Sequence, residues 1–141
     1  MVATGYARTY RANAILTASP GQLVLMLYDG ALKAIALARE GFDIPAEEPR
    51  RIQVINQHLL KAQAILAELQ IGLNLESGGD FARTMHGLYA YHHRRLFEAN
   101  LRKQVEPVVE VERLVRELRD AWAQMLSQQD TSPAQHLRGT A

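Results

Sequence analysis

The chain of 141 residues contains no cysteine, which excludes a disulfide framework, a thiolate metal site and a cysteine nucleophile. This absence also fits a reducing cytoplasm. The chain also lacks an excess of charge of either sign, because it has 16 basic and 15 acidic residues. Nucleic-acid binding is therefore not expected. No run approaches the ~20 consecutive apolar residues that span a bilayer, so membrane insertion is not expected either.

Apolar residues at helical spacing are plentiful, and they define four segments. We predict helices over about 20–40, from between Pro45 and Pro49 to about Leu73, from a Ser77–Asp80 capping pattern to about Arg102, and from Pro107 to about Leu126. Helices of this length joined by short connections predict an all-α protein, an antiparallel up-down four-helix bundle. Residues 1–18 are expected to form a mobile N-terminal capping arm, residues 19–126 the bundle, and residues 127–141 a polar, disordered tail.

The buried stripes of the middle helices follow from the same spacing. Steps of three and four residues predict the stripe of the second helix, which consists of Ile52, Ile55, Leu59, Ala62, Leu66, Leu69 and Leu73. In the third helix the expected stripe consists of Phe81, Met85, Leu88 and Leu96, with His92 in the same row. Trp122 of the fourth helix is expected in the core.

The first helix is more apolar than one buried stripe requires. Ser19, Pro20 and Gln22 form a helix start signal. Two apolar faces follow, one made by Leu23, Met26, Leu27, Ala31 and Ala34, the other by Val24, Leu25, Tyr28, Leu32 and Ile35. A helix that is apolar nearly all round must be covered on two sides, and in a short chain a partner can supply the second cover.

No arrangement of residues points to catalysis. No histidine stands three residues after a glutamate, the spacing that metal-binding bundles use, and Gly78-Gly79 has no following Lys-Ser or Lys-Thr. Ser19 and Ser77 are explained as helix caps. We therefore expect no catalytic residue, no metal and no cofactor, although a metal-dependent bundle enzyme stays open as a rival class until the metal content is measured.

Several polar side chains allow two interpretations. Asp29 lies among apolar residues of the first helix and either faces water or anchors a partner at the edge of an apolar groove. Tyr28, Tyr89 and Tyr91 suit either an interface or the bundle core. Tyr6 and Tyr10 lie on the arm without large apolar neighbours, so they are expected to dock onto the surplus apolar face of the bundle.

Several motifs together resemble a known family. The first is Tyr10-x-x-Asn13-x-Ile15-x-Thr17-Ala18-Ser19-Pro20-x-x-Leu23-x-x-Met26-Leu27-Tyr28-Asp29-Gly30-Ala31. Then come Leu73-x-x-Glu76-x-Gly78-Gly79, Leu88-Tyr89-x-Tyr91-x-x-x-Arg95-Leu96-x-x-Ala99-Asn100 and Leu118-x-x-Ala121-Trp122. Over residues 6–126 the chain resembles FliS, the export chaperone for flagellin. It departs from the family at Thr84-Met85, where Asn-Leu is frequent, and at His92, where a larger apolar residue is usual.

The resemblance implies that the disordered C-terminal segment of flagellin wraps around the bundle and becomes helical. It further implies delivery to the type III export apparatus through the gate protein FlhA, in the bacterial cytoplasm and without a cofactor. The residues expected to bind partners are Tyr6, Tyr10, Asn13, Ile15, Leu25, Tyr28, Asp29, Leu32, Tyr89, Tyr91 and Leu96. The alternative is a structural bundle without a flagellin cargo, which self-associates as a weak homodimer through the second apolar face of the first helix.

Overall fold

A computed structural model describes residues 19–73 and 78–140, with side chains as far as Gln129. These residues form helices and no strand. The helices are α2 (Pro20–Gly41), α3 (Arg50–Ile71), α4 (Gly79–Arg102) and α5 (Glu106–Thr140). The prediction of an all-α four-helix bundle is confirmed.

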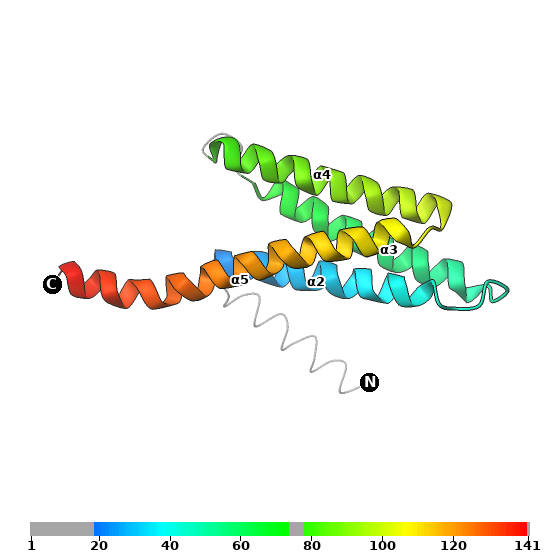
Figure 1. The fold of residues 1–141 in the computed structure, drawn as a ribbon, viewed down its shortest axis with the longest axis horizontal. Coiled ribbons are helices and arrows are strands. Elements are labelled where there is room, and N and C mark those ends of the chain that lie inside the picture. Colours follow the sequence, from blue (N-terminus) through cyan, green and yellow to red (C-terminus); the bar gives the residue numbers. More distant parts are fainter. Residues whose placement is uncertain (1–18, 74–77, 141) are drawn as a thin grey trace, which may run out of the picture.

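Consecutive helices run in opposite directions (Figure 1). Helix α2 packs against α3 and α5, and α4 packs against the same two helices from the other side. The beginnings of α2 and α4 therefore meet the end of α3 at one end of the bundle, and α5 passes beside them. That end of the bundle carries the candidate site described below.

The predicted start of α2 is confirmed in detail. The Ser19 hydroxyl accepts a hydrogen bond from the Gln22 backbone N–H, and the Gln22 side chain accepts one from the Ser19 N–H, both at 3.2 Å. This capping box satisfies two helix-end donors. At α4 the N-cap residue is Gly78, with no side-chain hydrogen bond, whereas the predicted cap Ser77 lies outside the described residues.

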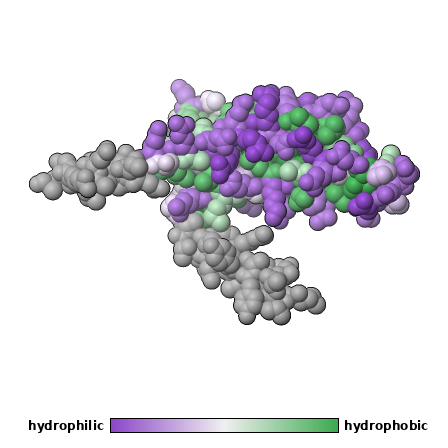
Figure 2. Space-filling model, turned by 60° about the horizontal axis from the view of Figure 1, so that its bottom comes forward, coloured by the Kyte–Doolittle hydropathy of each residue, from purple (hydrophilic) through white to green (hydrophobic). Residues whose placement is uncertain are grey.

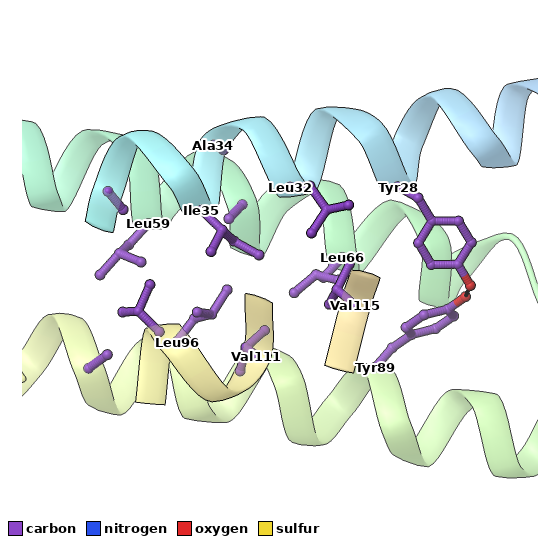
Figure 3. Packing of buried hydrophobic residues seen from close by; sticks show 14 of the residues in the cluster. Tyr28, Leu32, Ala34, Ile35, Leu59, Leu66, Tyr89, Leu96, Val111 and Val115 are labelled. Atoms are coloured by element: carbon purple, nitrogen blue, oxygen red, sulfur yellow. Dashed lines mark hydrogen bonds between the residues drawn. The ribbon is translucent and has the colours of Figure 1, made fainter. Parts of the chain in front are cut away.

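The core lies along the bundle axis and receives side chains from all four helices. Figure 3 shows Ile35, Leu59, Leu66 and Val111 converging between the helices, with Tyr28 and Tyr89 closing one end of the cluster. From Ile55 to Leu69 the predicted α3 stripe is buried, while Ile52 at its start is 58% exposed. The three-four spacing therefore identifies the inner face of α3 but not where that face stops.

The predicted stripe of α4 is partly wrong. Phe81 and Leu88 are exposed, and Tyr89 lies in the core instead. The buried row consists of Ala82, Met85, Tyr89, His92, Leu96 and Ala99. This row also has three-four spacing, but it includes alanines, whose small side chains let α4 approach its neighbours. Because the prediction considers only large apolar residues, it assigns part of the exposed face of α4 to the core.

Helix α5 continues beyond its expected end near Leu126 and reaches Thr140. Between these residues Gln128 and Gln129 favour helix, and no glycine or proline intervenes before Pro133. Figure 1 shows this last part of α5 extending past the start of α2. The division of the chain into arm, bundle and tail stays a prediction.

Among the described helices, α2 alone is long and apolar enough to cross a membrane by length and composition. The same composition suits a helix that is covered by neighbours in a bundle. Helix α2 packs against α3 and α5, and Leu32 and Ile35 lie in the core. The absence of membrane insertion stays an expectation.

We expect Gly41→Ala to lower the free energy of unfolding by about 1–3 kcal/mol. A Cβ at this buried position would lie 3.0 Å from side-chain carbons of Val54 and Ile55 and 3.3 Å from the Ile55 backbone nitrogen. The matched control is Gly87→Ala, whose Cβ would meet no described atom within 4 Å. On an exposed helix position this change should stabilise by ~0.5–1 kcal/mol. Urea unfolding of both variants checks the opposite signs.

Candidate partner-binding surfaces

A cavity of about 280 Å³ opens at the end of the bundle where α2 and α4 begin. Apolar side chains from all four helices line it, including Leu27, Leu69, Met85 and Trp122. Phe81 also lines this end cavity and is 66% exposed, so its ring is an apolar group that water reaches. The end cavity can therefore accept an apolar group from another molecule.

Tyr28 and Tyr89 lie side by side in the wall of the end cavity. Their hydroxyl groups are hydrogen-bonded to each other, and their ring centroids are 6.3 Å apart (Figure 3). Burial raises the pKa of both phenols, so both hydroxyls stay protonated at neutral pH. The two interpretations of these residues are thus not exclusive, because both side chains are buried and both line a cavity.

Trp122 holds the α2–α5 side of this region together. Its indole N–H donates a hydrogen bond of 2.8 Å to the Gly21 carbonyl oxygen. Gly21 has no side chain, and a Cβ there would lie 2.6 Å from a methyl carbon of Leu126. The first turn of α2 therefore depends on close backbone approach to α5.

A second depression lies between the start of α2 and α5. Leu25, one of the predicted partner-binding residues, lines it together with Ala123 and Leu126. Ser19 also lines this depression, so residues 1–18 join the described structure at its edge. Tyr6, Tyr10, Asn13 and Ile15 are among those residues and lie outside the described part of the chain.

A third surface, the lateral groove, lies between the first half of α3 and the last half of α4. Leu60, Phe97 and Leu101 line it, each more than half exposed, and Leu101 reaches 71%. A hydrogen bond of 2.8 Å between Asn56 and Asn100 crosses the groove. Figure 2 shows, on the face it displays, several hydrophobic patches within a largely hydrophilic surface.

Asp29 forms an ion pair across two helices. Its carboxylate accepts a hydrogen bond of 2.8 Å from the Arg119 guanidinium of α5, and its side chain is about half exposed. Arg39 and Glu112 form a second ion pair between α2 and α5. Asp29 therefore contacts water and links helices in this structure, and a role in anchoring a partner stays a prediction.

Tyr91 lies on the outer seam between α4 and α5. Its hydroxyl donates to the Glu110 carboxylate at 2.9 Å, and Arg95 donates to the same carboxylate at 2.8 Å. The hydrogen bond from Arg95 is the main reason that the pKa of Glu110 is lowered. Tyr91 is half-buried, so part of its ring remains available to a partner.

Leu32 and Leu96, also predicted to bind partners, lie in the core. A partner would contact these two side chains only if the helices repacked. Their burial therefore does not support the predicted role in partner binding. The exposed apolar residues that line the end cavity or the lateral groove, and that the prediction does not name, are Phe81, Leu60, Phe97 and Leu101. A usable signal was present, since Phe97 and Leu101 are four residues apart on α4, off its buried row.

Metal binding has no structural support in the described residues. They contain no group of three or more histidine, aspartate or glutamate side chains placed to hold an ion. Instead, His86 contacts Gln70 through a side-chain hydrogen bond, with 3.1 Å between the Gln70 Nε2 and His86 Nε2 atoms. The surfaces described above offer apolar side chains for binding.

Comparison with known proteins identifies the family of the chain. The model of the family described as "Flagellar protein FliS" matches residues 2–129. The flagellar secretion chaperone FliS of Bacillus subtilis is 38% identical over 117 residues, covering 83% of each chain. The proteins of that name from Salmonella typhimurium and Escherichia coli are 37% and 36% identical, with at least 85% of each chain covered. The chain belongs to the FliS family of flagellar secretion chaperones.

Proposed function

We propose that this protein is a cytoplasmic export chaperone for flagellin. It binds the disordered C-terminal region of flagellin, prevents premature polymerisation, and delivers the cargo to the type III export apparatus through the gate protein FlhA. Binding and release constitute the whole activity, with no catalytic step and no cofactor. Residues 1–18 serve as an arm that covers an apolar surface until a partner displaces it.

The observation that carries this proposal is the end cavity with the exposed ring of Phe81. The lateral groove supplies a second apolar surface on another side of the bundle. An amphipathic segment that folds on binding places apolar side chains into such grooves at helical spacing. Two separate surfaces suit a cargo that wraps, and the ordering cost of the cargo keeps its affinity low enough for release.

The direct test mixes the purified protein with a peptide from the C-terminal region of the host flagellin. The circular dichroism of the mixture should show more helix than the sum of the separate spectra. Light scattering on the same samples addresses self-association, because a homodimer unaffected by the peptide would favour the structural-bundle alternative. Elemental analysis addresses a metal enzyme, which needs close to one equivalent of bound metal.

We expect Phe81→Ser to weaken binding of the flagellin peptide at least about tenfold, because exposed aromatic anchors contribute strongly to binding. The free energy of unfolding should change by less than about 0.5 kcal/mol, since the ring packs little within the bundle. Titration calorimetry with the peptide measures the first effect and urea unfolding the second.

The lateral groove is tested in parallel by Leu101→Ser, and the matched control is Ile52→Ser. Ile52 is also an exposed apolar residue, but it lines neither the end cavity nor the lateral groove. Its replacement should leave peptide affinity unchanged. If Phe81→Ser and Ile52→Ser bind the peptide as tightly as the wild type, the end cavity is not the cargo site.

A further inference from the structure

Lys103 ends α4 in a backbone conformation that lysine seldom adopts. Its φ is 51°, in the left-handed region, and among the described residues it is the one residue other than glycine with a positive φ. Helices that end in this way usually have glycine or asparagine at this position, because a Cβ is crowded there. A residue that keeps such a conformation against a free-energy cost is a candidate for a functional role.

The charge of Lys103 is also placed unfavourably. Burial lowers the pKa of its ammonium most, and the charge of Arg51 lowers it further. An unperturbed lysine titrates about three pH units above neutrality, so the group remains a cation in the cell. Neither Lys103 nor Arg51 forms an ion pair with an acidic side chain in the part of the chain that the structure describes. Water can solvate the two groups, but it does not remove the repulsion between two positive charges.

The acidic residues of α3 and α4 do not supply the missing negative charge. Glu98 and Asp80 pair with arginines of α4. Glu68 lines the end cavity, at the opposite end of the bundle from Lys103. The Lys103 ammonium instead donates to the backbone and side-chain oxygens of Asn100, which are uncharged. The cation is therefore left to an acidic group of another molecule.

Lys103 lines the lateral groove beside its exposed apolar side chains. Leu60, Phe97 and Leu101 are each more than half exposed. Phe97 and Leu101 are one helical turn apart on α4, so an apolar row leads along this helix to the cation at its end. A small molecule needs a pocket that encloses most of its surface, whereas open apolar rows of this kind suit a helical segment of a protein.

We propose that the lateral groove binds an amphipathic helix that carries a carboxylate one turn beyond its apolar row, and that this carboxylate pairs with Lys103. The apolar side chains of the bound helix contact Leu60, Phe97 and Leu101. In the cell the helix is part of the cargo, so this part rests on the proposed function. The carboxylate offsets the repulsion between Lys103 and Arg51, which favours an acidic segment over a neutral or basic one.

The experiment uses two synthetic peptides of about 18 residues, long enough to form a helix, with the same stripe of leucines at helical spacing. They differ at one position, a turn beyond the stripe, which is glutamate in one peptide and glutamine in the other. Binding is followed by the NMR signals of the Asn100 side-chain amide, which lines the groove and donates to Asn56. The quantity compared among proteins is the affinity for the glutamate peptide divided by the affinity for the glutamine peptide.

In the wild type at low salt we expect this ratio to be about five, the effect of one partly buried ion pair. In Lys103→Asn the ratio should fall to about one. Asparagine tolerates the left-handed conformation, so this variant should fold as stably as the wild type. Arg102→Gln is the matched control, because it removes the same charge from the adjacent residue, which does not line the groove. Its ratio should equal that of the wild type.

Leu101→Ser tests the apolar part of the groove. Leu101 is 71% exposed, so its replacement should leave the fold intact. Both peptides should bind this variant several-fold more weakly than the wild type, because each loses the same apolar contact. The ratio should stay at the wild-type value, since Lys103 is unchanged.

A ratio near one in the wild type would overturn the proposal, as would equal ratios in the wild type and Lys103→Asn. Failure of both peptides to shift the Asn100 signals at about 1 mM would overturn it too. If Lys103→Asn unfolded more easily and kept the wild-type ratio, Lys103 would serve only to cap α4. No flagellin is present in this experiment, so its failure is distinguishable from failure of cargo binding.

Discussion

Replacing Leu96 with alanine is expected to lower the free energy of unfolding by about 2–5 kcal/mol. Its side chain is fully buried in the core, between α4 and the neighbouring helices (Figure 3). Removing it loses the free energy of burial and leaves a space that a close-packed bundle fills only in part. Urea unfolding followed by circular dichroism measures the change.

The neighbouring Phe97→Ala is the matched control for this prediction. Phe97 is larger than Leu96 but more than half exposed, so its replacement should cost less than about 1 kcal/mol. The comparison also bears on the resemblance-based expectation that Leu96 binds a partner. If Leu96→Ala kept full stability and lost peptide binding, Leu96 would act at the partner surface and not in the core.

The replacement of His92 with leucine is expected to stabilise the protein by about 1–3 kcal/mol at neutral pH. His92 is 1% exposed, and its Nδ1 atom has no hydrogen-bond partner among the described residues. Leucine has a similar volume and no polar atom to leave unsatisfied. Two hydrogen bonds, Asn56–Asn100 and Gln70–His86, show the register between the antiparallel helices α3 and α4. In this register Gln63 lies near the level of His92. The Gln63 side chain is also buried, and its oxygen has no hydrogen-bond partner among the described residues.

The pH dependence provides the sharper part of this prediction. Burial lowers the pKa of His92, and the nearby Glu110 charge opposes that shift only in part. At pH values above about 6.5, the pKa of the imidazole in the unfolded chain, His92 is neutral in both the folded and the unfolded state. Its protonation then makes no contribution to the free energy of unfolding. As the pH falls below that value, the unfolded chain binds a proton that the folded chain resists. This residue alone then lowers stability by up to about 1.4 kcal/mol per pH unit.

Urea unfolding at pH 7.5 and pH 5.5 separates these contributions. The wild type should lose more stability than His92→Leu between the two values, and the variant should be more stable at both. Equal losses in the two proteins would mean that the His92 ring finds water or another partner when protonated. A less stable variant at pH 7.5 would mean that the ring makes packing contacts that leucine cannot replace.

Much of the fold could be predicted from the sequence because it depends on local signals. The capping box at Ser19 and the spacing of the α3 stripe are properties of neighbouring residues, and both are present in the structure. The buried face of α4 is harder to predict, since the alanines Ala82 and Ala99 are buried as completely as the large apolar residues of that face. Which face turns inward depends on how closely α3 and α5 approach, and that is a property of the whole bundle.

The candidate site could be predicted only in outline. The surplus of apolar surface on the first helix indicates a partner, and the sequence allows Tyr28 and Tyr89 to lie either in the core or at an interface. Their hydrogen bond connects positions 61 residues apart on different helices, so no local pattern contains it. The spacing of Phe81 fits a stripe and predicts a core position, but the residue lies near the start of α4 and is largely exposed.

The positions at which the resemblance implies a departure from the family pattern are of different kinds. Thr84 is exposed, so its difference from the usual residue carries little cost for packing. Met85 is buried and lines the end cavity, where a flexible thioether side chain adapts to irregular space. His92 lies in the core, where the resemblance implies a larger apolar residue. This substitution therefore bears on stability rather than on the binding surfaces.

The exposure of Phe81 and Leu101 has a consequence for how such a protein changes over generations. Folding places little constraint on either side chain, so under the proposed function selection on these positions comes from the bound cargo. A change in the cargo can then be matched at these positions by one substitution at a time. The buried tyrosine pair lacks this freedom, since each ring serves both the folded core and the wall of the opening.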